Sequence, residues 1–140
     1  MICVPIVGTS MLKALDQITA AEKVADILEL RLDLIDSFDL SLLLNTANKP
    51  IIVTARSKLD GGQFKGSEEA RLGILHAALE AGVDYIDIEV STPREHLQPF
   101  LESHATSKII ISYHDFSHTP EDLFPLYEAM NAMPGEIIKI

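Results

Sequence analysis

The chain has 140 residues, of which 47% are hydrophobic and 23% charged, with 21 acidic against 11 basic side chains and a net charge of −10. These values fit one soluble globular domain and argue against nucleic acids and anionic membranes as partners, because both require clustered lysine and arginine. With a single cysteine and no apolar stretch near the roughly 20 residues that cross a bilayer, we expect a cytoplasmic protein without internal disulfides.

Six short runs rich in β-branched and apolar residues recur along the chain and predict β-strands. They span residues 2–7, 27–35, 50–56, 85–90, 108–114 and 136–140. Cys3 lies in the first run, where we expect it to be buried as a small hydrophobic side chain. The segments between the runs are long enough for helices, so strands and helices are predicted to alternate.

Helical signals lie in several of these intervening segments. Residues 70–79 place apolar side chains on one helical face, namely Leu72, Leu75, Ala78 and Leu79. Thr92 and Thr119 each precede a proline and stand three residues before a carboxylate. This pattern combines a capping hydroxyl with proline at the first helical position, so we expect helices to begin at both threonines.

The second and fourth runs alternate strictly between charged and apolar residues. Glu29, Arg31 and Asp33 share one face of the second run, and leucines occupy the other face. Asp87 and Glu89 likewise face away from their isoleucine neighbours in the fourth run. The central strands of an open doubly wound sheet are buried on both faces and read as continuous apolar runs. A polar face repeated on several strands instead favours a barrel with a charged interior.

We therefore predict an α/β fold of the (β/α)8 barrel family, with about six parallel strands and flanking helices. A complete barrel of this kind has about 250 residues and eight strands, so residues 1–140 are expected to form a single incomplete barrel domain that lacks the last two strand–helix units. Its first and sixth strands would remain open edges, which are templates for pairing with another chain. We expect self-association through these edges.

Polar residues stand late in the predicted strands. Because the carboxyl ends of parallel strands meet at one rim, these side chains are expected to surround one small anionic molecule. The set comprises Glu29, Arg31, Arg56, Glu89, His114 and Lys139. Taken singly, Glu29 and Arg31 could form an ordinary interior ion pair, His114 could be structural and Lys139 could be solvated. The glycine-containing segment 57–66 is long for a strand–helix connection and is predicted to act as a lid.

Six motifs, in order along the entire chain, resemble those of the type I 3-dehydroquinate dehydratases. They are ELRLD at 29–33, TAR at 54–56, DGG at 60–62, YIDIE at 85–89, SYHDF at 112–116 and IIK at 137–139. The resemblance implies a lyase of the shikimate pathway that dehydrates 3-dehydroquinate to 3-dehydroshikimate through a lysine Schiff base. It implies this small molecule as the partner, and neither a cofactor nor a metal ion.

The resemblance also implies a role for each matching residue. Lys139 would form the Schiff base, His114 would be the general acid and base, and Glu29, Arg31 and Arg56 would bind the substrate. We expect burial and the two arginines to lower the pKa of Lys139, which must be uncharged to attack a ketone.

Two departures from the family pattern bear on these roles. Asp60 replaces the family's usual glutamate, a carboxylate thought to orient the histidine, and its shorter side chain is expected to hold His114 less well. The family's last two strands are also missing, so we expect weak activity or none from these 140 residues alone.

Two other functions are left open by the sequence. The chain could be another Schiff-base lyase or aldolase on the same barrel, because a fold does not fix a substrate. It could also be a non-catalytic barrel fragment that self-associates or needs a completing segment.

Overall fold

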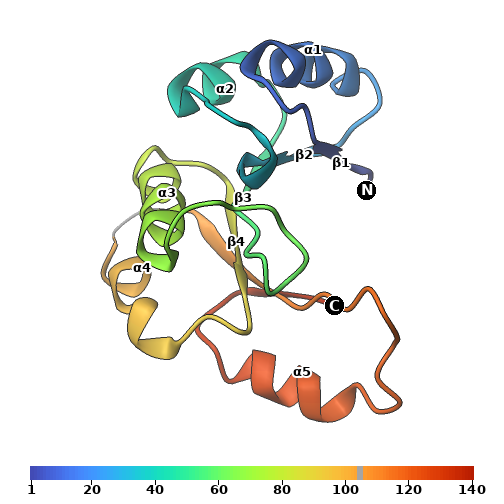
Figure 1. Cartoon of the computed structure of the whole chain (residues 1–140), viewed down its shortest axis with the longest axis vertical. Coiled ribbons are helices and arrows are strands. Elements are labelled where there is room, and N and C mark those ends of the chain that lie inside the picture. The colour runs from blue at the N-terminus through green and yellow to red at the C-terminus, as the bar shows by residue number, and fades with distance from the viewer. Residues whose placement is uncertain (104–105) are drawn as a thin grey trace.

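A computed structural model describes residues 1–103 and 106–140, and its six strands form one parallel sheet. The strands follow one another in sequence order: β1 (Cys3–Ile6), β2 (Ile27–Arg31), β3 (Ile51–Thr54), β4 (Tyr85–Glu89), β5 (Lys108–Ser112) and β6 (Ile137–Lys139). The sheet curves into a half-barrel with helices along its outer side (Figure 1). This architecture confirms the predicted barrel-family fold, because a doubly wound sheet would reverse its strand order.

Among the described residues, five helices lie on the outer side of the sheet (Figure 1). They are α1 (Met11–Ala21), α2 (Leu40–Thr46), α3 (Glu68–Glu80), α4 (Gln98–Glu102) and α5 (Phe124–Asn131). The first three begin where a side-chain oxygen accepts a hydrogen bond from a backbone N–H of the first turn. Ser10, Asp39 and Ser67 are these capping residues.

The runs 50–56 and 108–114 leave the sheet two residues before their predicted ends, and three other boundaries are also wrong. The run 27–35 leaves the sheet after Arg31 and turns through a 3-10 helix, η1 (Leu32–Leu34). Thr92 caps no helix, since the next element is the short η2 (Arg94–His96), which has no side-chain cap. Helix α5 begins five residues after Thr119, where Asp122 accepts a hydrogen bond from the backbone N–H of Phe124. In both cases tertiary structure overrules the local threonine–proline pattern.

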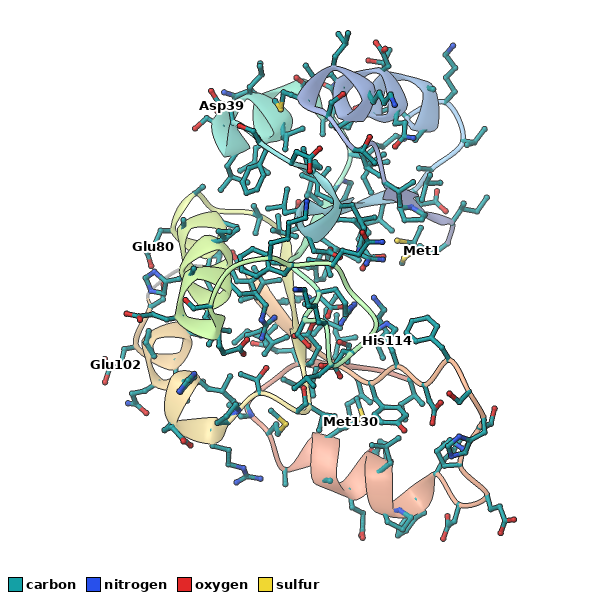
Figure 2. The ribbon with its side chains drawn as sticks, in the orientation of Figure 1. Met1, Asp39, Glu80, Glu102, His114 and Met130 are labelled. Atoms are coloured by element: carbon teal, nitrogen blue, oxygen red, sulfur yellow. The ribbon has the colours of Figure 1, made fainter. Side chains whose placement is uncertain are left out.

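The main hydrophobic core lies between the sheet and the helices. Leu28, Leu30, Ile86 and Ile88 point outward from the strands and are fully buried, as the alternation predicted. Helix α3 contributes the predicted apolar face of residues 72, 75, 78 and 79. Figure 2 shows Met130 where α5 packs against the sheet, and this side chain is 1% exposed.

A second, smaller apolar cluster lies on the inner face of the sheet. It consists of Ile27, Ile52 and Ile110, with Tyr85 packed against it. The next inward-facing residues along these strands are polar, because inward positions recur every second residue. The small cluster therefore forms an apolar layer beneath the charged groups, as in the stacked layers of barrel interiors.

Cys3 is exposed, contrary to the prediction. It is paired in register with Ile27 and so belongs to the inner face, and β1 has a strand neighbour on one side only within the described residues. Partial burial and the nearby Glu29 raise the pKa of the Cys3 thiol, against the opposing effect of Lys139. Among the described residues, no helix has the length and apolar character needed to cross a membrane.

Candidate active site

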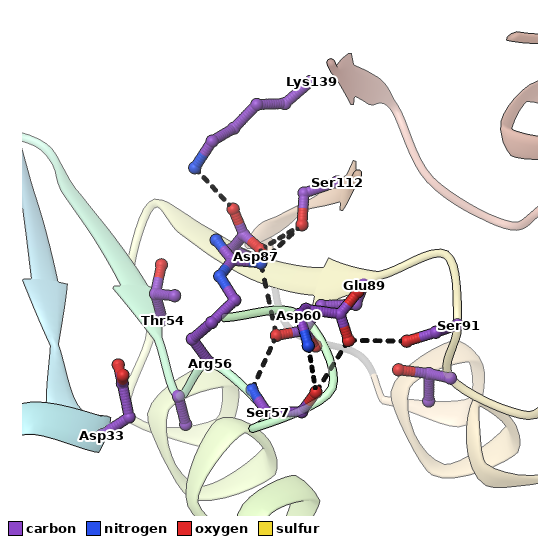
Figure 3. Close-up of polar contacts among 12 residues, drawn as sticks. Asp33, Thr54, Arg56, Ser57, Asp60, Asp87, Glu89, Ser91, Ser112 and Lys139 are labelled. Atoms are coloured by element: carbon purple, nitrogen blue, oxygen red, sulfur yellow. Dashed lines mark hydrogen bonds and ion pairs between the residues drawn. The ribbon is translucent and has the colours of Figure 1, made fainter. Parts of the chain in front are cut away.

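Polar side chains from adjacent strands form a layer on the inner face of the half-barrel. The sheet register aligns Glu89 with Ser112 and Ser112 with Lys139, and it aligns Thr54 with Asp87. Figure 3 shows Lys139 approaching from β6 while Arg56 approaches from the end of β3, with Asp87 between them. The layer therefore brings together groups that are far apart in the sequence.

Lys139 is bound to two carboxylates. Its Nζ lies 2.8 Å from Asp87 Oδ2 and 3.1 Å from Glu29 Oε1, and its side chain is 34% exposed. Burial acts to lower the pKa of Lys139, but the negative charges of Asp87 and Glu29 outweigh it and raise that pKa above its ordinary value. The expectation of a lowered pKa is wrong, because carboxylates rather than arginines are the direct neighbours of the amine.

Arg56 is the cation at the centre of the layer. Its guanidinium is 3% exposed, and Nη1 donates to Asp87 Oδ1 at 2.8 Å, to Ser112 Oγ at 2.7 Å and to Glu89 Oε1 at 3.2 Å. Burial acts to raise the pKa of Asp87, but Arg56 and Lys139 overcome it and hold that pKa below its usual value. Asp87 thus remains an anion held between two cations.

Arg71 of α3 extends this network to the outer layer of the molecule. The side chain is 2% exposed, and Nη1 lies 2.6 Å from Glu89 Oε2 and 3.0 Å from the carbonyl oxygen of Ala55. Nη2 and Nε bind both oxygens of Glu68, at 2.6 and 2.8 Å, and Nη2 also donates to Thr92. Sequence reasoning missed Arg71, although an arginine beside the apolar stripe of a helix is a signal that could have identified it.

His114 follows β5 at the same rim. Its Nδ1 is buried without a hydrogen-bond partner among the described residues, and its ring stacks on Phe116 with centroids 6.3 Å apart. Burial, followed by the positive charges of Arg56 and Lys139, lowers the pKa of His114. The imidazole also lines a pocket of about 350 Å³ that Tyr113 and Leu123 share. The lowered pKa favours the neutral form of the imidazole, and Lys139 is not among the residues that line this pocket.

Arg31 points to a different partner from the other predicted site residues. Its Nε and Nη2 donate to the two oxygens of Asp33, at 2.9 and 2.8 Å, and Asp33 also accepts from the backbone N–H of Gln63. The side chain of Asp33 is fully buried, whereas that of Arg31 is 22% exposed. The hydrogen bond to Asp33, partly opposed by burial, raises the pKa of Arg31 further, so its charge is permanent.

Asp60 lies in the segment 57–66, but its hydrogen bonds involve serines. It accepts from Ser57 Oγ at 2.7 Å and from Ser91 Oγ at 2.8 Å. No hydrogen bond joins it to His114 Nδ1 within the described part of the chain. Together with the Gln63–Asp33 contact, these bonds tie the segment to the end of β2 and to the end of β4. The segment predicted to be a lid is thus anchored at Asp60 and Gln63 in this structure.

The structure brings together most of the residues predicted from the strand ends. Lys139, Glu29 and Arg56 meet in one layer, and His114 lies near enough for both cations to influence its pKa. The sequence identified Asp87 only as an inward-facing charge, although it is the closest partner of Lys139. In residues 1–103 and 106–140, no group of three or more histidine, cysteine or acidic side chains is arranged to hold a metal ion.

Comparisons with known proteins found matches over nearly the whole chain. A family model described as type I 3-dehydroquinase matches residues 2–140. The chain is 33% identical over 170 residues to a 3-dehydroquinate dehydratase of Methanococcus vannielii, covering 100% of this chain and 78% of that protein. It is 34% identical over 144 residues to a 3-dehydroquinate dehydratase of Coxiella burnetii, covering 99% of this chain and 60% of that protein.

Two solved structures share the fold. The crystal structure of type I 3-dehydroquinate dehydratase from Clostridium difficile with covalently modified comenic acid aligns with a TM-score of 0.76 and 27% identity, covering 84% of this chain and 52% of that chain. The 3-dehydroquinate dehydratase of Aquifex aeolicus aligns with a TM-score of 0.66 and 28% identity, covering 99% of this chain and 66% of that chain. The chain thus spans only part of the length of each relative.

Proposed function

Because the chain belongs to the type I 3-dehydroquinase family, as its motifs predicted, we propose that it takes part in the dehydration of 3-dehydroquinate to 3-dehydroshikimate through an imine on Lys139. The observation that carries the proposal is the position of the Lys139 amine, held by Asp87 and Glu29 inside a half-barrel and close enough for its charge to lower the pKa of His114. An amine in a polar, partly buried layer can condense with a ketone and needs no bound cofactor.

Once the imine has formed, the elimination requires two proton transfers and one electron sink. Loss of water from the adduct of amine and ketone gives an iminium ion, whose positive nitrogen accepts the electron pair released when the adjacent carbon loses its proton. Departure of the β-hydroxyl with a proton then forms the new double bond, and hydrolysis of the iminium frees Lys139. The lowered pKa of His114 favours the unprotonated imidazole, which can accept the proton from carbon. The imidazolium formed can then donate that proton to the departing hydroxyl, so we assign both transfers to His114.

The raised pKa of Lys139 fits this sequence of steps in a specific way. Asp87 and Glu29 favour a positive charge on the nitrogen, and the iminium intermediate carries that charge at the same place. The amine must first lose a proton, which the neutral imidazole of His114 can accept. The two carboxylates therefore support the intermediate more than the initial attack.

We assign substrate binding to Glu29, Arg31 and Arg56, with unequal shares. Arg31 is the most exposed of the three and keeps a permanent positive charge, so it is suited to a carboxylate or hydroxyl of the substrate. Arg56 already binds Asp87, Glu89 and Ser112 and contributes mainly through its charge. We assign Asp60 to fixing the segment 57–66 rather than to His114.

The test is reductive trapping of the imine. The chain is incubated with 3-dehydroquinate and sodium borohydride, and peptide mass spectrometry locates the stable adduct. We expect it on Lys139, no adduct in Lys139→Met, and an unchanged adduct in Lys108→Met, a matched loss of an exposed lysine. An adduct on other lysines alone, or none at all under conditions in which the chain is folded, would rule out this function.

We also propose that these 140 residues fold as one unit and associate through the sheet edges. Strands β1 and β6 each pair with a single strand among the described residues. An unpaired edge presents backbone N–H and C=O groups that a second strand can bind. Copies of this chain are therefore suited to pair edge to edge.

A further inference from the structure

A continuous series of opposite charges runs from helix α3 to the Lys139 amine. Arg71 binds Glu89 at 2.6 Å, Glu89 binds Arg56 at 3.2 Å, Arg56 binds Asp87 at 2.8 Å and Asp87 binds Lys139 at 2.8 Å. Apart from Lys139, each member is at most 3% exposed at its side chain. Solvent screening within the series is therefore weak, so a change of charge at one member alters the electrostatic potential at its neighbours.

We infer that Arg71 is a positioning residue that favours the ammonium form of Lys139. It does so by holding Glu89 ionised, so that Glu89 competes with Asp87 for the charge of Arg56. The inference rests on the proposed role of Lys139 as the reactive amine. Arg71 itself stays outside the reacting group, because its contacts are Glu89, Glu68, Thr92 and a backbone carbonyl.

Glu89 is the member whose charge depends most on Arg71. Its Oε2 receives the short contact from Arg71, whereas Oε1 receives two longer ones, from Arg56 and from the backbone N–H of Ser57, both at 3.2 Å. Burial raises the pKa of Glu89 even though Arg71 and Arg56 both act to lower it. Loss of Arg71 therefore favours uptake of a proton by Glu89.

A neutral Glu89 would change the balance at Lys139. Arg56 would then direct its charge to Asp87 and Glu29 alone, which leaves these carboxylates less free to hold the ammonium form of Lys139. In the Arg71→Gln variant, the positive charge of Arg71 and the negative charge of Glu89 are both lost. Glu89 stands nearer to Lys139 in the series than Arg71 does, so loss of its negative charge has the larger effect on the amine. The pKa of Lys139 is then expected to fall. The titratable groups that interact with Lys139 are Asp87, Glu29, His114 and Cys3, and Arg56 is linked to it through Asp87 and Glu29.

The experiment measures the amine directly and needs no substrate. Trace labelling of the folded chain with acetic anhydride at fixed pH gives the rate at Lys139 relative to exposed Lys13 in the same molecule. Below the pKa of the amine, each unit of decrease raises this ratio about tenfold. For Glu89→Gln we expect the labelling ratio to rise about tenfold, which corresponds to a decrease of about one unit in the pKa of Lys139.

Three further variants separate positioning from general stability. Arg71→Gln should raise the ratio in the same direction, and the double variant should rise no further than Glu89→Gln alone. Glu68→Gln is the matched control, because Glu68 binds Arg71 from the outer side and is 38% exposed. It should lower stability and leave the ratio unchanged. Arg71→Lys, which keeps the charge, should restore most of the wild-type ratio.

The inference is overturned if Arg71→Gln folds and keeps a ratio within about twofold of the wild type, whether or not Glu89→Gln shifts it. If Arg71→Gln does not fold, Glu89→Gln and Arg71→Lys decide the question. Failure of imine trapping with a normal shift in labelling would reject the dehydratase function and leave the charge series intact. Normal trapping with no shift in labelling would reject the role of Arg71 and leave the dehydratase function intact.

Discussion

Replacement of Asp87 by asparagine tests the centre of the charged layer, because this carboxylate is fully buried and binds three other side chains. The asparagine side chain would keep the shape of the aspartate and one oxygen, which Arg56 and Ser112 can still use. Its amide nitrogen would then face Lys139, where two hydrogen-bond donors meet. The variant therefore removes the main carboxylate from Lys139 with little change in packing.

The size of the effect follows from the partners that remain. Removing one member of a buried ion pair costs about 3–5 kcal/mol when the other is left alone. Here Arg56 keeps Glu89 and Lys139 keeps Glu29, so we expect the free energy of unfolding to fall by about 2–3 kcal/mol. The exposed Asp36, which pairs with Lys65, serves as the control, and Asp36→Asn should change stability little.

Urea denaturation at several pH values measures the difference in the free energy of unfolding between the wild type and Asp87→Asn. The pKa of Asp87 is lowered in the folded state from 3.8, so its charge stabilises the fold above that pH. This contribution is lost as the pH falls through the lower folded-state pKa. The gap between wild type and Asp87→Asn should thus be constant near neutral pH and narrow below 3.8. Equal stability at neutral pH, or a gap that widens in acid, would refute the reasoning.

Three other predictions concern the anchored segment and the sheet edges. Gly61 has φ of 77° and its Cβ would collide with Phe116, so Gly61→Ala should lose about 1–2 kcal/mol of stability by urea denaturation, whereas Gly73→Ala in open space on α3 should gain about 0.5 kcal/mol. Asp33→Asn should loosen Arg31 and speed hydrogen exchange at the amide of residue 63, and unchanged exchange would contradict the anchoring role. Sedimentation of the 140-residue chain should show concentration-dependent association, and a strict monomer at all concentrations would exclude association through open edges.

Much of the fold is predictable from the sequence because inward and outward positions of a strand differ in chemistry. Glu29, Asp87 and Glu89 indicate a polar inner face by their alternation with apolar residues, and the rules for parallel connections supply the strand order. Boundaries are harder to predict. Alternation continues past Arg31 in the sequence, but a three-residue 3-10 turn also buries Leu32 on one side, so the pattern alone does not mark the end of the strand. Thr92 has the sequence pattern of a helix cap, whereas its hydroxyl accepts a hydrogen bond from Arg71.

Prediction of the site fails where it depends on which neighbour lies closest. The sequence supplies both arginines and carboxylates around Lys139, and only the register places Asp87 and Glu29 in contact with the amine. Contact with these two carboxylates, rather than with the arginines, is why the pKa of Lys139 is raised and not lowered. Arg71 lies 18 positions from Glu89, and nothing local links the two. Such long-range pairs require the packing of a helix on a strand, which local patterns do not encode.

The raised pKa of Lys139 has a consequence for the energy profile of the proposed reaction. Two carboxylates stabilise the ammonium ion before the substrate arrives and the iminium ion afterward, so their contribution to these two states is similar. What they disfavour is the neutral amine between the two states. In the proposed reaction, transfer of its proton to His114, whose own pKa is lowered, would therefore be uphill, and we expect this cost to add to the barrier for attack on the ketone. Loss of the Glu89 charge, which by the inference above weakens the hold of Asp87 on Lys139, would ease this step.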